Sequence, residues 1–452
     1  MMTRKLFGTD GIRGRANRHP VTPEIALRLA RATGFLLRGA GGAPPRFVIG
    51  RDTRRSGAMF ESALLAGLTS VGAEILLAGV VPTPAVAGLV TELGVEGGFV
   101  ISASHNPAGD NGIKLFGGDG YKLDDALELR LEELILTDEI DGVRPEAGSV
   151  GTVSTMVDAS RRYAARAKES VPGMSLHGIH IAVDCANGAS FRTTPSTLSD
   201  LGATLSVFHA APDGMNINER CGSTHPEEMS RLVRETGAQI GISHDGDADR
   251  LLLCDERGDA LDGDEILAML ALDALRRGTL AGRTLVATVM SNLGLDECLA
   301  AAGVSVVRTA VGDRYVVGEM KRGGFSIGGE QSGHMILRDH GTSGDGLLAA
   351  LQILRIMTES GRPLSELRRV LKKYPQAQRN LRVREKPPLD SLVEVSDLVA
   401  ETERALAGKG RVLLRYSGTE PKVRLLVEGS DEAMINVAAD KIAAALTAAI
   451  GA

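Results

Sequence analysis

Aromatic side chains are scarce in this sequence of 452 residues, and tryptophan is absent. Aromatic residues make up only 3% of the chain, which argues against a surface that binds nucleic acid by stacking its bases. The chain also has no excess of basic residues, because 57 acidic residues outnumber 51 basic ones and give a net charge of −6. We therefore expect no nucleic acid partner and no membrane surface partner.

Disulfide and zinc motifs are also missing. The spacing of the four cysteines, which are Cys185, Cys221, Cys254 and Cys298, matches no zinc or redox pattern, so we expect thiols in a reducing compartment. Residues 1–14 lack the apolar run and cleavage site of a signal peptide. No uncharged apolar stretch approaches the ~20 residues of a membrane span. These features predict a cytoplasmic protein.

Short apolar runs that alternate with amphipathic stretches make up most of the chain. Such alternation predicts α/β domains with largely parallel sheets. The C-terminal end differs, because an alanine-rich helix is expected over 431–450. Strands are expected at 46–50, 74–81, 98–102, 180–184, 239–243, 285–289 and 304–309, and helices at 57–72, 84–93, 264–276 and 293–302.

The length of the chain predicts roughly three or four domains of about 100–150 residues each. Polar, glycine-containing breaks at 146–152 and 256–263, and proline-containing breaks near 375 and 388, mark the boundaries. We predict three α/β domains over 1–155, 156–258 and 259–372, and a smaller α+β domain over 373–452.

A serine-rich loop follows the expected strand at 98–102, with the sequence SASHNP over 102–107. Ligands bind at the carboxyl ends of strands in open α/β sheets, so a serine hydroxyl there can face a ligand. Ser, Asn and Pro also favour plain turns, which leaves a turn as the alternative. His105 and Lys114 are then either functional or ordinary polar loop residues.

Three aspartates at alternate positions occupy the segment HDGDADR over 244–250. Apolar strand sequences flank this segment, so Asp245, Asp247 and Asp249 would repel one another unless a cation binds. Mg²⁺ is usually bound by a few carboxylate oxygens, and this segment lacks the longer loop of an EF-hand. The segment predicts a magnesium site, with an exposed acidic turn as the alternative.

Two further loops carry groups that bind sugars and phosphates. GGEQSGH over 328–334 combines small residues with side chains that bind hydroxyl and amine groups. RYSGTEP over 415–421, with Arg424 beyond it, combines forked guanidinium groups with hydroxyls and backbone amides. Together with the serine and the aspartates, these loops predict phosphoryl transfer to or from a phosphorylated small molecule. No nucleotide phosphate loop for a kinase is visible.

These motifs resemble, in the same order, those of the α-D-phosphohexomutase superfamily. The resemblance begins at KLFGTDGIRG over 5–14 and runs through SASHNP with DNGIK, DGDADR and GEQSGH to 415–424, nearly the whole chain. Segments 216–218, 221–227 and 311–316, together with Gln331, are similar to the branch that acts on glucosamine phosphates.

The resemblance implies three mixed-sheet α/β domains plus a smaller C-terminal α+β domain around a central cleft. The implied reaction interconverts glucosamine 6-phosphate and glucosamine 1-phosphate, with glucosamine 1,6-bisphosphate as intermediate or activator, toward UDP-N-acetylglucosamine. One Mg²⁺ would be bound in each site. An amino-sugar phosphate would be the small-molecule partner, and the protein would be a monomer or homodimer.

The resemblance also implies roles for individual residues. Ser104 would carry the phosphoryl group and would bind the metal with Asp245, Asp247 and Asp249. Arg250 would stabilise the transferring group, and Lys114, His105 and His334 are the candidates for proton transfer. Substrate would be bound by Arg13, Glu330, Ser332, Arg415, Ser417, Gly418, Thr419 and Arg424.

Three alternatives share some of these residues. A phosphomannomutase/phosphoglucomutase would act on neutral hexose phosphates and would differ at the sugar loop. A metal-dependent phosphatase would transfer the phosphoryl group to water. A sugar-phosphate sensor would bind without turnover, which the intact Ser104 and the three aspartates argue against.

Overall fold

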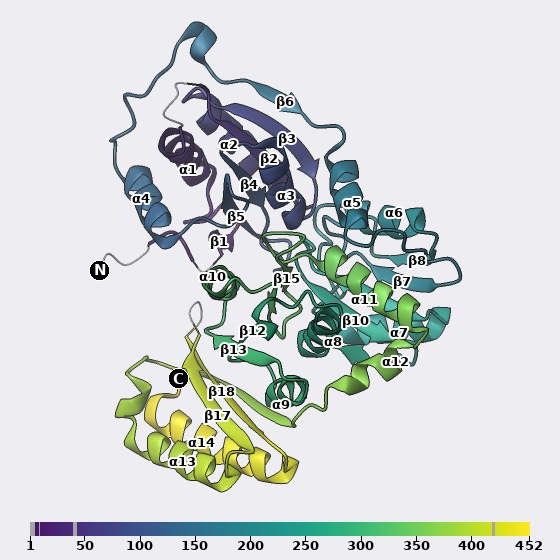
Figure 1. The fold of residues 1–452 in the computed structure, drawn as a ribbon. Coiled ribbons are helices and arrows are strands. Elements are labelled where there is room, and N and C mark those ends of the chain that lie inside the picture. Colours follow the sequence, from purple (N-terminus) through teal and green to yellow (C-terminus); the bar gives the residue numbers. More distant parts are fainter. Residues whose placement is uncertain (1–4, 9, 39–42, 418–420) are drawn as a thin grey trace. The chain divides into compact units, whose positions relative to one another are not determined.

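The computed structural model describes residues 5–8, 10–38, 43–417 and 421–452, and the chain divides into two compact units. The first unit comprises 1–291 and 302–370, and the second comprises 292–301 and 371–452. Figure 1 shows three β-sheets with surrounding helices in the first unit and one sheet in the second.

The first sheet has the strand order β1-β5-β4-β2-β3-β6. Strands β2, β3, β4 and β6 are parallel to their neighbours in this group, whereas β5 is antiparallel to both β4 and β1. The strands are β1 (Ile12–Arg15), β2 (Arg46–Arg51), β3 (Glu74–Val80), β4 (Gly97–Ile101), β5 (Asp110–Gly117) and β6 (Val153–Thr155).

Helices cover both faces of this sheet. The apolar side chains of α1, α2 and α4 share one core with Phe47 and Phe99, whose rings meet edge to face at 5.7 Å. On α3, Val86 approaches the backbone of Gly50 so closely that a Cβ there would lie 2.6 Å from its Cγ2. The helices are α1 (Pro23–Leu36), α2 (Gly57–Thr69), α3 (Thr83–Leu93) and α4 (Asp125–Leu136).

The second sheet has the order β11-β10-β9-β7-β8, in which β7, β8 and β9 are parallel and β10 is antiparallel to β9. Its strands are β7 (His180–Asp184), β8 (Thr204–Phe208), β9 (Ile240–His244), β10 (Leu251–Asp255) and β11 (Ala260–Leu261). The neighbouring helices in the chain are α5 (Ala159–Glu169), α6 (Thr193–Asp200) and α7 (Pro226–Thr236).

The third sheet has the order β13-β12-β14-β15, with β15 antiparallel to β14. Its strands are β12 (Thr284–Thr288), β13 (Ser305–Thr309), β14 (Ile327–Gly329) and β15 (Met335–Leu337). The helices of this part are α8 (Gly263–Arg276), α10 (Asp313–Gly323), α11 (Gly346–Ser360) and α12 (Leu364–Leu367).

The second unit contains the antiparallel sheet β16-β18-β17, with α9, α13 and α14. By length and composition α14 is apolar enough to cross a membrane, but Ile435 and Ile442 on this helix are buried in the core of the unit. The elements are α9 (Leu293–Ala301), β16 (Gln376–Arg382), α13 (Val393–Leu406), β17 (Gly410–Tyr416), β18 (Lys422–Gly429) and α14 (Glu432–Ile450).

The predicted fold class is confirmed, with three mixed α/β sheets and a smaller C-terminal part with an antiparallel sheet. The expectation of largely parallel sheets from periodicity alone needs correction, because each of the first three sheets contains antiparallel pairs. Periodicity shows where strands lie but not their direction, and short connections allow a strand to return beside its predecessor.

Candidate active site

The loops expected to carry the chemistry join consecutive antiparallel strands. Residues 102–109 connect β4 to β5, residues 245–250 connect β9 to β10, and residues 330–334 connect β14 to β15. Each loop follows the carboxyl end of a strand that is parallel to its other neighbour. This is the edge of an α/β sheet where ligands bind.

Ser104 lies at the centre of the first loop and is almost completely buried. Its hydroxyl donates a hydrogen bond of 2.5 Å to Asp245 Oδ2, across 141 residues of sequence. Its φ of 53° is left-handed, a conformation that costs a non-glycine residue about 1–2 kcal/mol. The Ser104 N–H donates to Ser102 Oγ at 2.9 Å, and Ser102 Oγ donates to Asp52 at 2.6 Å. The Ser102 hydroxyl is thus engaged in holding the loop, whereas the Ser104 hydroxyl faces the aspartates.

Arg54 holds the loop 102–109, named here the serine loop, through its guanidinium. This guanidinium is fully buried beside Asp52. This group donates to the carbonyl oxygens of Ser104 and Asn106 at 2.9 and 2.7 Å, and also to those of Pro107 and Asp110. Because a rigid fork satisfies several acceptors at once, this single side chain fixes much of the loop backbone.

Asn218, which lies between β8 and α7, holds the same loop. Its amide nitrogen donates to the carbonyl oxygens of Ser104 at 2.9 Å and Asn106 at 3.0 Å. Its own backbone N–H donates to Ala186 at 2.9 Å. The position of Ser104 therefore depends on two parts of the chain that are more than 100 residues apart.

Asp245, Asp247 and Asp249 converge as expected. All three are buried, and one carboxylate oxygen from each lies within 4.8 Å of the other two. Burial, followed by the charges of Asp249 and Asp247, raises the pKa of Asp245 to about 7. Repulsion of this kind between buried carboxylates is relieved by a cation.

A buried oxygen atom shows that a metal ion fits this group. Oδ1 of Asp247 has no hydrogen-bond partner within the described part of the chain, whereas Oδ1 of Asp249 lies 3.5 Å from His334 Nδ1. Unpaired buried acceptors are costly, and a hard divalent cation prefers oxygen ligands of this kind. Asp247 is also fixed by Thr83 at the start of α3, whose hydroxyl donates to Asp247 Oδ2 at 2.5 Å.

Lys114 lies among acidic groups and is completely buried. Its Nζ is 2.7 Å from Asp247 Oδ2, 3.0 Å from Asp249 Oδ2 and 3.3 Å from Asp10 Oδ2. Burial disfavours the ammonium, but the three carboxylates more than offset this cost and hold the pKa of Lys114 well above its usual value. In this arrangement Lys114 is a cation that holds its proton tightly.

The pKa values of His105 and His334, the two histidines predicted for proton transfer, are shifted in opposite directions. His105 Nδ1 lies 3.3 Å from Ser104 Oγ, and burial together with the nearby Arg250 and Arg13 lowers the pKa of His105 to about 4. His334 Nδ1 lies 3.5 Å from Asp249 Oδ1. Burial of His334 opposes its charging, but the Asp249 and Asp313 carboxylates raise its pKa.

The loop 330–334, which is expected to bind the sugar (the sugar loop), lies beside the loop 245–250 with the three aspartates (the metal loop). Arg250 and His334 form a β-bridge, and the Arg250 N–H points to Asp245 Oδ1 at 3.3 Å. Within the sugar loop, Glu330 Oε1 accepts a hydrogen bond from Gly312 N–H at 3.0 Å, and Ser332 Oγ lies 3.4 Å from Glu330 Oε2.

Arg13 reaches the same cluster from β1. Its guanidinium contacts Asp10, which also contacts Lys114 and Lys122. Burial opposes the charge of Arg13, but Asp10 and the metal-loop carboxylates raise its pKa. Arg13 is therefore a cation held close to the aspartates.

The phosphate loop belongs to the second unit. Arg415 and Arg424 are direct partners in the β17–β18 pair, so the two arginines lie opposite each other on neighbouring strands. Ser417 follows β17, and its N–H donates to Lys422 at 2.8 Å. Gly418 and Thr419 lie outside the described residues.

Several members of the site were missed in the sequence. Lys122 links Asp10 and Asp313, while Arg54 and Asn218 hold the serine loop. A signal existed for Arg54, because RDTRRSG follows an expected strand at its carboxyl end. Asp10, Asn218 and Asp313 fall in segments that carried the family resemblance, but no local pattern reveals their partners.

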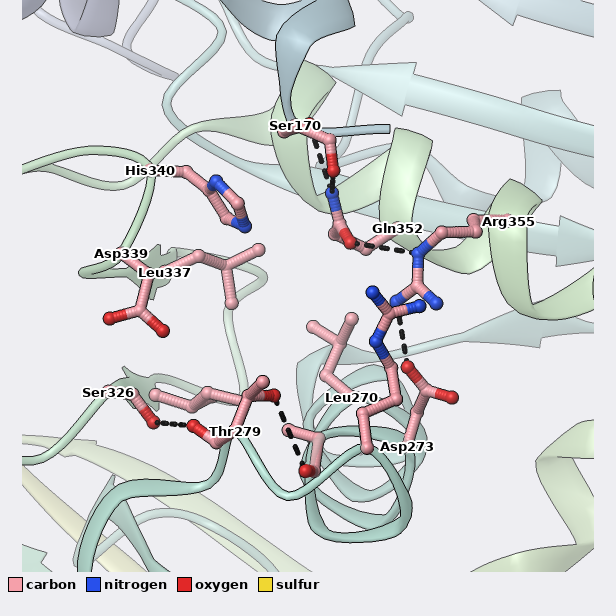
Figure 2. Close-up of a pocket in the computed structure, with 13 residues that line it drawn as sticks. Ser170, Leu270, Asp273, Thr279, Ser326, Leu337, Asp339, His340, Gln352 and Arg355 are labelled. Carbon is pink, nitrogen blue, oxygen red and sulfur yellow. Dashed lines mark hydrogen bonds and ion pairs between the residues drawn. The ribbon is translucent and has the colours of Figure 1, made fainter. Parts of the chain in front are cut away.

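A separate cavity of about 190 Å³ lies near α8 and α11 (Figure 2). Its polar side chains largely bond to one another, as Arg355 does to Asp273 at 2.7 Å and Gln352 does to Ser170 at 3.0 Å. None of the predicted site residues is among the described residues that line it.

The chain matches the phosphoglucomutase/phosphomannomutase domains throughout its length. Residues 4–141, 161–258 and 262–374 match the alpha/beta/alpha domains I, II and III, and residues 379–445 match the C-terminal domain.

Similar proteins carry a consistent name. Phosphoglucosamine mutase from Anaeromyxobacter sp. (strain Fw109-5) is 50% identical over 100% of this chain and 97% of that protein. Phosphoglucosamine mutase from Syntrophotalea carbinolica is also 50% identical, over 98% of this chain and 97% of its own length. Among solved structures, a phosphoglucomutase/phosphomannomutase family protein from Burkholderia thailandensis shares the fold, with a TM-score of 0.81 and 24% identity over 99% of this chain and 98% of that chain.

Proposed function

Because this chain belongs to the phosphoglucomutase/phosphomannomutase family, and relatives at 50% identity are phosphoglucosamine mutases, we propose that it interconverts glucosamine 6-phosphate and glucosamine 1-phosphate. The observation that carries the proposal is the Ser104 hydroxyl, which lies 2.5 Å from Asp245 within a group of three buried aspartates. A hydroxyl so placed is suited to carry a phosphoryl group beside a divalent cation.

Ser104 would be phosphorylated in the active protein. A hydroxyl of the sugar phosphate would attack this phosphorus, the bond to Ser104 Oγ would break, and glucosamine 1,6-bisphosphate would form. After the sugar reorients, Ser104 would take back the other phosphoryl group. Each half-reaction moves one proton from the attacking hydroxyl to the leaving oxygen, through His105, Lys114 or His334.

Asp245, Asp247 and Asp249, together with an oxygen on Ser104, would hold one Mg²⁺, which supplies positive charge to the transferring group. Arg250 and Arg13 would add cationic charge from the protein. Glu330 and Ser332 would bind sugar hydroxyls. Arg415, Ser417, Gly418, Thr419 and Arg424 would bind the phosphate that is not transferred. We expect the enzyme in the cytoplasm.

The decisive variant is Ser104→Ala, with Ser102→Ala as the matched control. We expect Ser104→Ala to fold, to lose the phosphatase-sensitive mass of one phosphoryl group, and to lose mutase activity by more than about 1,000-fold. Ser102→Ala should keep the phosphoryl group, since its hydroxyl bonds to Asp52. Intact mass spectrometry and a glucosamine phosphate assay measure both effects.

Retained turnover in Ser104→Ala, or a phosphoryl group mapped to Ser102, would contradict the covalent route. Parallel assays with glucose and mannose phosphates test the neighbouring specificity. If these neutral sugars turn over faster than the amino sugar, the substrate assignment is wrong although the mechanism stands. Faster release of inorganic phosphate than isomerisation would instead indicate a phosphatase.

A further inference from the structure

A second cluster of metal-ligating side chains lies in the part of the chain built on β7 and β8. Asp184 ends β7, His209 follows β8, and Cys221 precedes α7. One ligand atom from each residue lies within 4.8 Å of the other two. The cysteine spacing gave no zinc motif, because these ligands come from three separate loops and meet only in the folded chain.

The carboxylate of Asp184 is held in place by backbone groups. It is fully buried, and its two oxygens accept hydrogen bonds from Ala186 N–H at 2.8 Å and Gly222 N–H at 2.7 Å. Gly222 neighbours Cys221, so the same bond fixes the distance between the carboxylate and the thiol. The group is thus arranged before any ligand arrives.

The imidazole of His209 lies between two carboxylates, with one ring nitrogen facing Asp184 and the other facing Glu228. Its Nδ1 lies 3.1 Å from Asp184 Oδ1, on the side of the cluster. Its Nε2 lies 3.8 Å from Glu228 Oε1 on α7. A carboxylate behind the second nitrogen fixes the tautomer and ring orientation of a metal-bound histidine.

The backbone around the cluster adopts costly conformations. Ala186, His209 and Arg220 all have a left-handed φ, of 54°, 46° and 52°. Each such residue costs about 1–3 kcal/mol and persists only where the surrounding structure determines it. Three of them around one triad indicate that its loops are held in a fixed arrangement.

We propose that Asp184, His209 and Cys221 form a second metal site, which binds a thiophilic divalent transition metal of the Zn²⁺ class. One sulfur, one nitrogen and one oxygen suit this class, whereas the three aspartates near Ser104 suit a hard cation. Three protein ligands leave a fourth position for water, and the His209 side chain is 28% exposed, which gives the ion a path of entry.

A nucleophilic thiol is the competing interpretation, and the surroundings disfavour it. The Cys221 side chain is fully buried, and a buried cysteine is unreactive toward molecules in solution. A metal ion instead binds the thiolate, and the displaced proton passes to solvent.

The second site is connected to the serine loop through the backbone. Asn218, which holds the carbonyl oxygens of Ser104 and Asn106, lies three residues before Cys221 and donates its N–H to Ala186 beside Asp184. A metal bound by His209 and Cys221 would therefore hold both ends of the segment 209–221, which carries Asn218.

The test is titration of the full-length chain with Co²⁺ as a spectroscopic substitute for Zn²⁺, in the presence of excess Mg²⁺. A cobalt–thiolate charge-transfer band is expected, and it identifies this site because the aspartate triad contains no sulfur. Added Zn²⁺ should abolish the band by displacing Co²⁺. Absence of the band in the wild-type protein would overturn the proposal.

Variants assign the ligands. Cys221→Ser and His209→Gln should each weaken Co²⁺ binding more than about 100-fold, and Glu228→Gln about 10–100-fold. Cys298→Ser, on α9 in the other unit, is the matched control and should leave the band unchanged. A band that persists in Cys221→Ser, or that disappears in Cys185→Ser alone, would overturn the assignment.

Because the readout is a spectrum rather than turnover, this result does not depend on the proposed function. Thermal unfolding of Cys221→Ser and His209→Gln without metal checks that both variants fold. His209 is partly exposed, so its replacement keeps the test decisive if the buried Cys221 tolerates no change.

Discussion

Arg54 shows how one buried charge can set the geometry of a reactive loop. Its guanidinium is paired with Asp52 and donates to four carbonyl oxygens between Ser104 and Asp110. An unpaired buried charge would cost several kcal/mol, so the pairing with Asp52 makes this position possible. The hydrogen bonds then fix the backbone that gives Ser104 its left-handed conformation.

Arg54→Lys should therefore lower turnover more than it lowers substrate affinity. Lysine keeps the charge next to Asp52 but cannot reach several carbonyls, and about 1 kcal/mol for each lost bond predicts a loss of roughly 3 kcal/mol in the free energy of unfolding. We expect kcat to fall at least about tenfold. Arg55→Lys is the control, since Arg55 is exposed. Equal kinetic effects in both variants would contradict this role.

Asp345 gives the protein a pH-dependent contribution to stability. This residue caps α11, accepts a hydrogen bond of 2.8 Å from Tyr163, and has a pKa raised to about 6 because it is buried. The folded state holds the proton more tightly than the unfolded state, in which the pKa is about 3.9. The contribution is therefore complete below about pH 4 and is lost as the pH rises through about 6.

Asp345→Asn isolates this contribution. Relative to the variant, the wild-type protein should lose up to about 3 kcal/mol of unfolding free energy between pH 4 and pH 7. Urea unfolding of both proteins across this range measures the difference. A constant difference, or one that grows with pH, would show that Asp345 is ionised throughout.

At the scale of elements, the serine and metal loops approach each other at Gly246. A Cβ on Gly246 would lie 2.6 Å from the carbonyl oxygen of Ser104 and 2.9 Å from Asn218 Nδ2. The absence of a side chain at this position therefore allows two hairpins from different sheets to place Ser104 against Asp245.

Gly246→Ala should move the two hairpins apart and reduce kcat at least about tenfold, because small displacements of reacting groups are costly. The expected fold is unchanged, which circular dichroism and thermal unfolding would show. Gly318→Ala is the control, since a Cβ at that position in α10 meets nothing within 4 Å and alanine favours the helix. Normal turnover in Gly246→Ala would contradict the tight approach.

The sequence predicts these elements well but not how they meet. Strands and helices such as β4 and α3 lie within a few residues of their expected ranges, because their apolar patterns are local. The three aspartates could be grouped because they are neighbours in sequence. Arg54, Asn218 and the Asp184–His209–Cys221 cluster could not, since their partners are brought close only by tertiary folding. The four domain ranges stay a prediction.

At the scale of the whole molecule, a divalent cation should stabilise the folded state. Lys114 offsets only part of the charge of the three buried aspartates, and a ligand that binds only the folded state adds about 2.7 kcal/mol at 100 times its dissociation constant. Mg²⁺ should raise the melting temperature, and a chelator should remove both this increase and the activity. Asp247→Asn should weaken the response. Full activity of the chelated protein would exclude a metal requirement.

The place of helix α9 shows that the chain connects its two units more than once. It lies in the middle of the sequence, yet it belongs with the C-terminal sheet, where Asn292 donates to Tyr374 at 2.9 Å and Leu293 N–H donates to Glu428 at 3.0 Å. The polypeptide must therefore pass between the two units three times. A single protease cut after residue 370 would not release the C-terminal unit whole, because one of its helices would stay covalently attached to the other fragment.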